Sequence, residues 1–172
     1  MKIDIARQPL VPAFMTLFAL AVAAMCAGIP VSDTSGAVRD ALPLLGGQLA
    51  RFQAAYPVWS KFAAGFMLLF TGMCAGRITI RYNLYTVGTC LPIPLYAIVA
   101  CGIATGGNYL AGFAASMLLA LATKNYCRAF CNGYGFDAIF RASLYLGLMP
   151  LVYAPGLPML LLLPLILQET GI

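Results

Sequence analysis

The chain has 172 residues, of which 62% are hydrophobic and 9% are charged. Soluble domains usually carry about 25% charged residues and roughly 45–50% apolar ones. This chain therefore has too few polar side chains to cover a globule in water, and its mean hydropathy is +0.91. The composition predicts an all-α polytopic transmembrane helix bundle forming one integral membrane domain, residues 1–172. It argues against soluble enzymes, coiled coils, disordered tails and nucleic-acid-binding modules.

The residue types present exclude several kinds of metal, haem and catalytic site. The chain has no histidine, only five acidic residues, and six cysteines, none of which forms a Cys-x-x-Cys pair. Histidine-based metal sites, histidine-ligated haem and Ser-His-Asp catalysis are therefore excluded. We predict no catalytic residue, no metal and no cofactor. A membrane transferase acting on a lipid-linked phosphate is a minor alternative, because no general base can be named for it.

Apolar runs long enough to cross the bilayer as helices predict about six spans, the first an uncleaved signal anchor. They cover residues 11–29, 58–76, 85–105, 109–123, 136–153 and 157–167. The stretch 31–57 is the only long polar segment. The spacing of its apolar residues predicts an amphipathic helix that lies on the non-cytoplasmic surface of the membrane and is broken near Gly46 and Gly47. The uncharged cores of the last two runs reach only about 20 Å or less by the helical rise. These two runs therefore form either short full spans or a re-entrant hairpin.

The basic residues predict the orientation. With the N-terminus inside, cytoplasmic segments hold Lys2, Arg7, Arg77, Arg81, Lys124, Arg128 and Arg141. The outer side holds Arg39, Arg51 and Lys61. Because cytoplasmic loops of membrane proteins are enriched in Lys and Arg, the sequence predicts a multi-pass inner-membrane protein with both termini in the cytoplasm.

Asp137 and Arg141 are the first candidate site. Ionisable groups at a membrane boundary are costly, so each is a functional suspect. The spacing of four residues puts the two side chains on one helix face. They form either a proton or ion relay, or a clamp for a phosphate headgroup, or a structural ion pair at a helix start that also benefits from the helix dipole.

Four further basic residues form a second candidate site. Arg77, Arg81, Lys124 and Arg128 are expected on the cytoplasmic face, where they either bind anionic lipid headgroups and phosphate or merely set the topology. Pro92 and Pro94 are expected to break the third span, which makes either a transporter-like binding site or a packing kink. Cys127 and Cys131 would share a helix face if the fourth span continued, and they are expected to be free thiols.

The second half of the chain carries a weak family pattern. It includes Arg81-Tyr82-Asn83-Leu84-Tyr85, a proline-bearing apolar run, Asn108, the stretch 136–144 and the tail Tyr153-Ala154-Pro155. Over residues 77–167 the chain resembles an uncharacterised family of polytopic inner-membrane proteins from Bacteroidota. The resemblance implies no activity. Members of that family continue into further helices, so it implies that this chain is a shortened form.

Two classes of function follow. The first is a non-enzymatic subunit or scaffold of a cell-envelope complex, with membrane lipids and other membrane subunits or a second copy as partners. The second is a small transporter or lipid-phosphate-binding protein that uses Asp137 and the basic cytoplasmic residues.

Overall fold

The chain is all-helical throughout the part that the structure describes. The computed structural model describes residues 10–26, 44–82, 90, 92–104, 108–132 and 135–161. In chain order the helices are α1 (Leu10–Cys26), α2 (Leu44–Ala55), α3 (Pro57–Arg81), α4 (Pro92–Ala104), α5 (Tyr109–Asn132), α6 (Phe136–Val152) and the 3₁₀ helix η2 (Ala154–Leu161). No strand occurs within these ranges, which confirms the all-α expectation.

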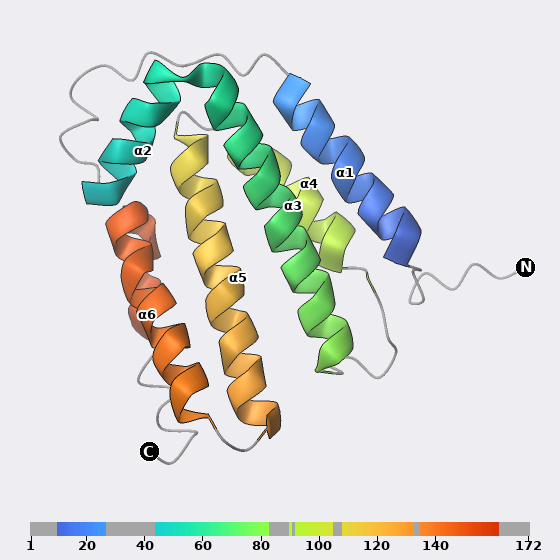
Figure 1. Ribbon diagram of the computed structural model, residues 1–172, viewed down its shortest axis with the longest axis vertical. Helices are drawn as coiled ribbons and strands as arrows, with labels where there is room; N and C mark the ends of the chain where they lie inside the picture. The colour runs from blue at the N-terminus through green and yellow to red at the C-terminus, as the bar shows by residue number, and fades with distance from the viewer. Residues whose placement is uncertain are drawn as a thin grey trace, which may run out of the picture.

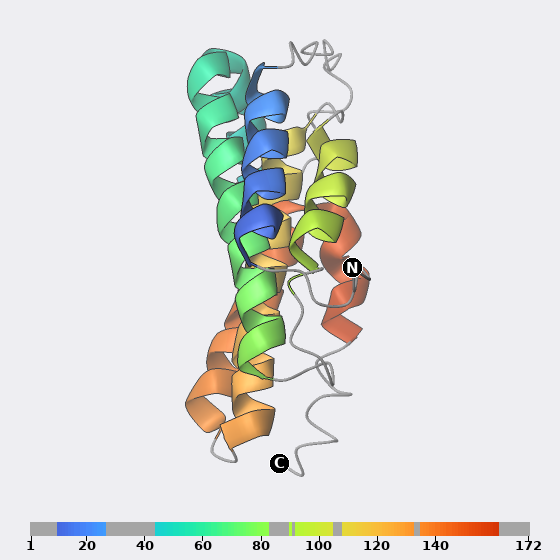
Figure 2. The same cartoon turned by 90° about the vertical axis from the view of Figure 1, so that its right-hand side faces the viewer.

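The helices form an elongated bundle (Figures 1 and 2). The two longest, α3 and α5, run side by side, and α1 and α4 lie against α3 as far along as Gly72 and Gly76. The most extensive contact joins α5 to α6. The lower ends of α3, α5 and α6 extend past the beginnings of α1 and α4 in both views. The bundle is therefore thicker at one end than at the other.

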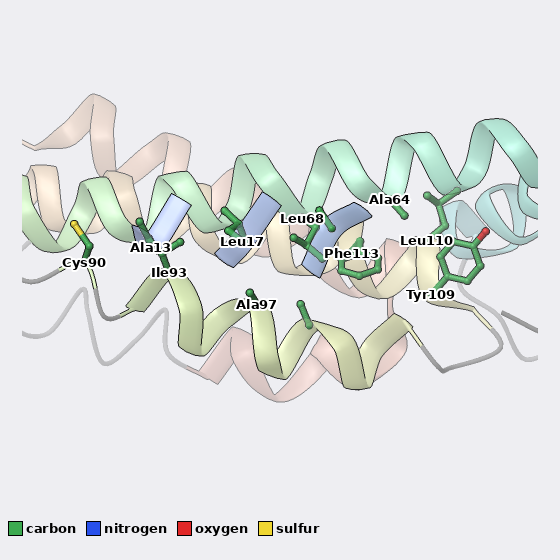
Figure 3. Close-up of a cluster of buried hydrophobic side chains, with 12 residues drawn as sticks. Ala13, Leu17, Ala64, Leu68, Cys90, Ile93, Ala97, Tyr109, Leu110 and Phe113 are labelled. Carbon is green, nitrogen blue, oxygen red and sulfur yellow. The ribbon is translucent and has the colours of Figure 1, made fainter. Parts of the chain in front are cut away.

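Alanine dominates the main core, which lies between α1, α3, α4 and α5 (Figure 3). Leu17, Leu68, Ile93 and Phe113 fill the spaces between the alanines and are each at most 1% exposed. Small residues let helix backbones approach closely, and this is the usual way that helices pack in lipid, where burial of apolar surface provides no driving force.

Local hydrogen bonds fix the ends of the long helices. Pro57 opens α3, at a position where its missing N–H costs nothing. The Tyr82 N–H closes α3 by donating to the Ile78 carbonyl at 3.1 Å. At the start of α5 the Leu110 N–H donates to Oε1 of Gln53 in a long contact of 3.4 Å. A side chain of α2 thus satisfies one of the backbone donors that every helix start leaves open.

Among the described residues only α3, with 25 residues, is both long and apolar enough to cross a membrane. At 1.5 Å per residue it reaches about 37 Å. A shorter apolar helix spans Ala13–Ala23 within α1. One candidate span is weak support for a membrane protein, and a multi-pass topology stays a prediction.

Two helices extend beyond the spans predicted for them. The second span was expected to stop at residue 76 and the fourth at 123, but α3 runs to Arg81 and α5 to Asn132. Polar residues were interpreted as connections, yet a helix can continue beyond its apolar part as long as its backbone hydrogen bonds do. The fifth run matches α6 within one residue at its end. The described start of the sixth run is a 3₁₀ helix.

The outer amphipathic segment also differs from the prediction. Gly46 and Gly47 lie inside α2 and do not break it. α2 packs against α3, α5 and α6 of its own chain. Residues 27–43, which contain the rest of this predicted segment, lie outside the described residues.

Candidate functional site: a cation-lined cavity at the end of α3

A cavity of about 700 Å³ at the thin end of the bundle brings predicted site residues together. It lies between the last turns of α3, the first turn of α4 and one turn of α5. Its walls are formed by Phe70, Met73, Cys74, Arg77, Ile78, Ile80, Arg81, Tyr82, Ile93 and Lys124. Ligand sites in proteins commonly have volumes of roughly 300–1,000 Å³, so the cavity is large enough to hold a small molecule or part of a lipid.

Three of the four predicted patch cations line this cavity. Arg77 and Arg81 are one helical turn apart on α3, and Lys124 faces them from α5. The thiol of Cys74 lies within electrostatic range of both Lys124 and Arg77, which places these two cations around one space. The structure therefore joins residues that are more than 40 positions apart in the sequence.

Arg128 does not belong to this group. It lies one turn beyond Lys124 on α5, is exposed, and is not part of the cavity wall. Arg141 is exposed on α6. The predicted four-residue patch is thus a cavity of three cations with a fourth cation on the surface nearby.

Asp137 and Arg141 form the ion pair that their spacing predicts. Arg141 Nη2 lies 3.1 Å from Asp137 Oδ2, and Arg141 Nε donates to Asp137 Oδ1 at 3.1 Å. The Asp137 side chain is 68% exposed and the Arg141 side chain is 57% exposed. Asp137 also lies in the first turn of α6, where the helix dipole favours a negative charge. The geometry agrees with the structural reading, and a relay role for the pair stays a prediction.

Pro92 and Pro94 occupy the first turn of α4 and do not break a helix in its interior. Backbone N–H groups in a first turn have no partner within the helix, so proline removes nothing there. The expected kink is absent from the described helix 92–104, and residues 83–89 and 91, which precede it, lie outside the described residues. The two prolines instead fix where α4 begins, and this places Ile93 in the wall of the cavity.

Cys127 and Cys131 share a face of α5, and both are free thiols. Burial, and secondarily the neighbouring Cys131, raise the pKa of the Cys127 thiol above its ordinary value. No group of three or more His, Cys, Asp or Glu residues that could hold a metal occurs in the described ranges. The raised pKa of Cys127 is the opposite of what an activated thiol nucleophile requires.

Two structural features escaped the sequence reasoning. Gly72 and Gly76 are four apart in an apolar helix, a spacing known to allow close helix packing, and this signal could have been found. The second is a pair of buried hydroxyl groups on different helices. Ser60 Oγ on α3 lies 2.6 Å from Tyr109 Oη on α5. Such a pairing depends on the tertiary fold and leaves no local pattern.

No family model matches the chain, and neither a curated protein nor a solved structure does. The resemblance over residues 77–167 stays a prediction.

Proposed function

We propose that this chain is a multi-pass, non-enzymatic membrane subunit or scaffold of a cell-envelope complex. The observation that carries the proposal is the reversed arrangement of side chains on α3. Most of its buried positions hold small or polar residues such as Ser60, Ala64 and Gly72, whereas Phe62 and Phe66 are 61% and 67% exposed. A helix in water buries its large apolar side chains, so this pattern is expected of a helix that faces lipid or another membrane helix.

The outward aromatic residues continue around the junction of α2 and α3. They line a shallow groove of about 530 Å³ formed by Phe52, Tyr56, Trp59, Phe62, Ala63 and Phe66. Tyr56 and Trp59 lie at the start of α3, where the membrane interface opposite the cavity is expected. Aromatic rings with a polar edge favour that depth. Phe66 and Phe70 continue the surface along α3, with ring centroids 6.3 Å apart.

The groove is where we place a partner helix. The small residues that could have served this purpose are used inside the chain, because Gly72 contacts α1 and Gly76 contacts α4. The exposed aromatic residues are the large apolar surface that remains on α3. A contiguous exposed apolar surface of this kind is typical of a protein–protein or membrane contact.

The distribution of charge supports the orientation that we propose. Arg77, Arg81, Lys124, Arg128 and Arg141 all lie where α3 and α5 end and α6 begins. Arg51 and Lys61 lie toward the opposite end. An excess of basic residues at one end is expected of the cytoplasmic side of an inner-membrane protein. An impermeant maleimide should then label the exposed Cys131 in inverted vesicles and leave it unlabelled in intact spheroplasts.

The test of the subunit role is purification of the tagged full-length chain from its native membrane in a mild detergent, followed by mass spectrometry. We expect a stoichiometric protein partner that is lost in the variant Phe62→Ala/Phe66→Ala. The variant Phe136→Ala/Phe140→Ala, which removes two exposed rings from α6, is the matched control and should retain the partner. Recovery of the chain alone or as a homo-oligomer would contradict the subunit role.

A small transporter is the second candidate, and the cavity between α3, α4 and α5 favours it. The role that we assign to Asp137 in that case is to take up and release the proton, while Arg141 stays charged and holds the carboxylate in place. Proteoliposomes with an internal pH-sensitive dye provide the test, with a potassium diffusion potential as the driving force. A transporter predicts a proton flux that Asp137→Asn abolishes, whereas the subunit role predicts no flux in either protein.

A further inference from the structure

The cavity at the end of α3 is divided into a charged part and an apolar part. Arg77 and Arg81 line it from the last two turns of α3, and Lys124 lines it from α5, near Cys74 and Arg77. Phe70 and Met73 lie about two turns earlier on α3. From residue 70 to residue 81 the helix rises about 16 Å. The ligand that this cavity fits therefore has a charged end and an apolar end.

The charged part carries no compensating carboxylate within the described residues. Asp137 is the only acidic residue in those ranges, and it is paired with Arg141 outside the cavity. Three cations around one space repel one another, and the low dielectric of apolar walls strengthens this repulsion. Guanidinium groups and an ammonium group together suit a phosphate, which accepts several charge-assisted hydrogen bonds.

The apolar part has the character of a lipid contact. Phe70 and Met73 are exposed along the outer face of α3, and Ile80 continues that face toward the cations. Ile93 is fully buried and forms the floor beneath α3. A soluble anion would leave Phe70, Met73 and Ile80 uncovered, whereas an acyl chain would cover them.

We propose that this cavity binds an anionic phospholipid. Arg77, Arg81 and Lys124 hold the phosphate of the headgroup, and one acyl chain lies along Phe70 and Met73. This site rests on the proposed membrane placement of α3 but not on the proposed partner protein. The same cations are expected at the cytoplasmic leaflet, where anionic lipids attract basic residues.

Native mass spectrometry of the full-length protein provides the test, with phosphatidylglycerol and phosphatidylcholine offered at equal concentration. We expect retention of phosphatidylglycerol over phosphatidylcholine. Lys124→Gln should weaken the binding of phosphatidylglycerol about fivefold, the factor that corresponds to about 1 kcal/mol for one basic residue. Arg77→Gln should have a similar effect, which guards against a folding defect in a single variant.

Arg128→Gln is the matched control, because it removes one charge from the same helix one turn away from Lys124. It should change phosphatidylglycerol retention by much less than Lys124→Gln. Equal losses in both variants would mean that the general surface charge attracts the lipid, and the proposed site would be wrong. Equal retention of the two lipids by the unmodified protein would also overturn it.

A second arm separates a lipid from a free phosphate compound. Cys74 lines the cavity and is a free thiol, so peptide-resolved maleimide labelling reports occupancy. Phosphatidylglycerol should protect Cys74 and glycerol 3-phosphate should not. Protection by glycerol 3-phosphate at the same concentration would overturn the assignment to a lipid.

Alkaline carbonate extraction of membranes keeps the two proposals distinguishable. Release of the chain into the supernatant would contradict the proposed membrane placement itself. Retention in the membrane together with no preference for phosphatidylglycerol would contradict the lipid site alone.

Discussion

Gly76 of α3 lies so close to Ile93 of α4 that a β-carbon on the glycine would be 2.5 Å from the Ile93 Cδ1 atom. Four residues earlier, a β-carbon on Gly72 would lie 2.7 Å from Cδ2 of Leu17 on α1. Both partner side chains are fully buried. The two glycines therefore let one helix approach two neighbours, and the Gly76 contact fixes the wall of the cavity.

Replacing Gly76 with alanine should destabilise the protein. Forcing an additional methyl group into a filled core typically costs about 1–3 kcal/mol. Alanine is favoured over glycine inside a helix by about 1 kcal/mol, so the net loss is smaller than the packing cost alone. Thermal unfolding of the variant in detergent should show a lowered midpoint.

Gly147 of α6 is the matched control. It is exposed, and a β-carbon there would meet nothing within 4 Å. Gly147→Ala should therefore raise the midpoint, by the equivalent of about 0.5–1 kcal/mol. If Gly76→Ala were as stable as Gly147→Ala, the close contact of α3 with α4 would be wrong.

Tyr109→Phe should cost about 1 kcal/mol, the typical contribution of one hydrogen bond. The variant removes the hydroxyl that lies 2.6 Å from Ser60 Oγ, and both residues are buried. Ser60 keeps its hydrogen bond to the Pro57 carbonyl at 2.8 Å, which limits the penalty. Tyr153→Phe, on an exposed side chain, should leave the unfolding midpoint unchanged, and an equal effect of both variants would refute the buried pairing.

Cys127 should react with a maleimide more slowly than Cys131 at neutral pH. Only the thiolate is nucleophilic, and burial raises the pKa of the Cys127 thiol above the ordinary value of 9.0. The thiolate fraction of Cys127 is therefore small at pH 7 and still rising above pH 9. Peptide-resolved labelling should show a Cys127 rate that keeps increasing in this range, and a plateau below pH 8 would contradict the account.

Asp137→Asn should alter the free energy of unfolding by less than about 1 kcal/mol, since exposed ion pairs and helix-dipole contacts contribute little. The matched variant Arg141→Gln should have a similarly small effect. The double variant should lose no more than the larger single loss, because each single change already breaks the pair. A loss of several kcal/mol would show that the pair supports more than the start of α6.

The sequence predicted helices better than it predicted their ends. The run 136–153 matched α6 because glycine and an acidic first turn mark its start. The run 109–123 stopped short because Lys124 and Asn125 were interpreted as a connection. Inside α5 the Asn125 Nδ2 group donates to the Leu121 carbonyl at 2.8 Å, so a polar residue is accommodated within the helix.

The cavity could be predicted only in part. The charge pattern indicated Arg77, Arg81 and Lys124 because topology places basic residues at one membrane face. It could not separate Lys124 from Arg128, because the two share a face of α5 and only the position of the cavity along the helix tells them apart. The apolar wall could not be predicted from the sequence either, since the position of Ile93 depends on how closely Gly76 lets α4 approach α3.

The most direct test of the membrane placement uses Trp59, the only tryptophan in the chain. Its side chain is 68% exposed on the outer aromatic face of α3. In proteoliposomes, phospholipids brominated near the headgroup should quench its fluorescence strongly, and aqueous iodide should quench it weakly. Strong quenching by iodide with none by any brominated lipid would place this face in water and contradict the account.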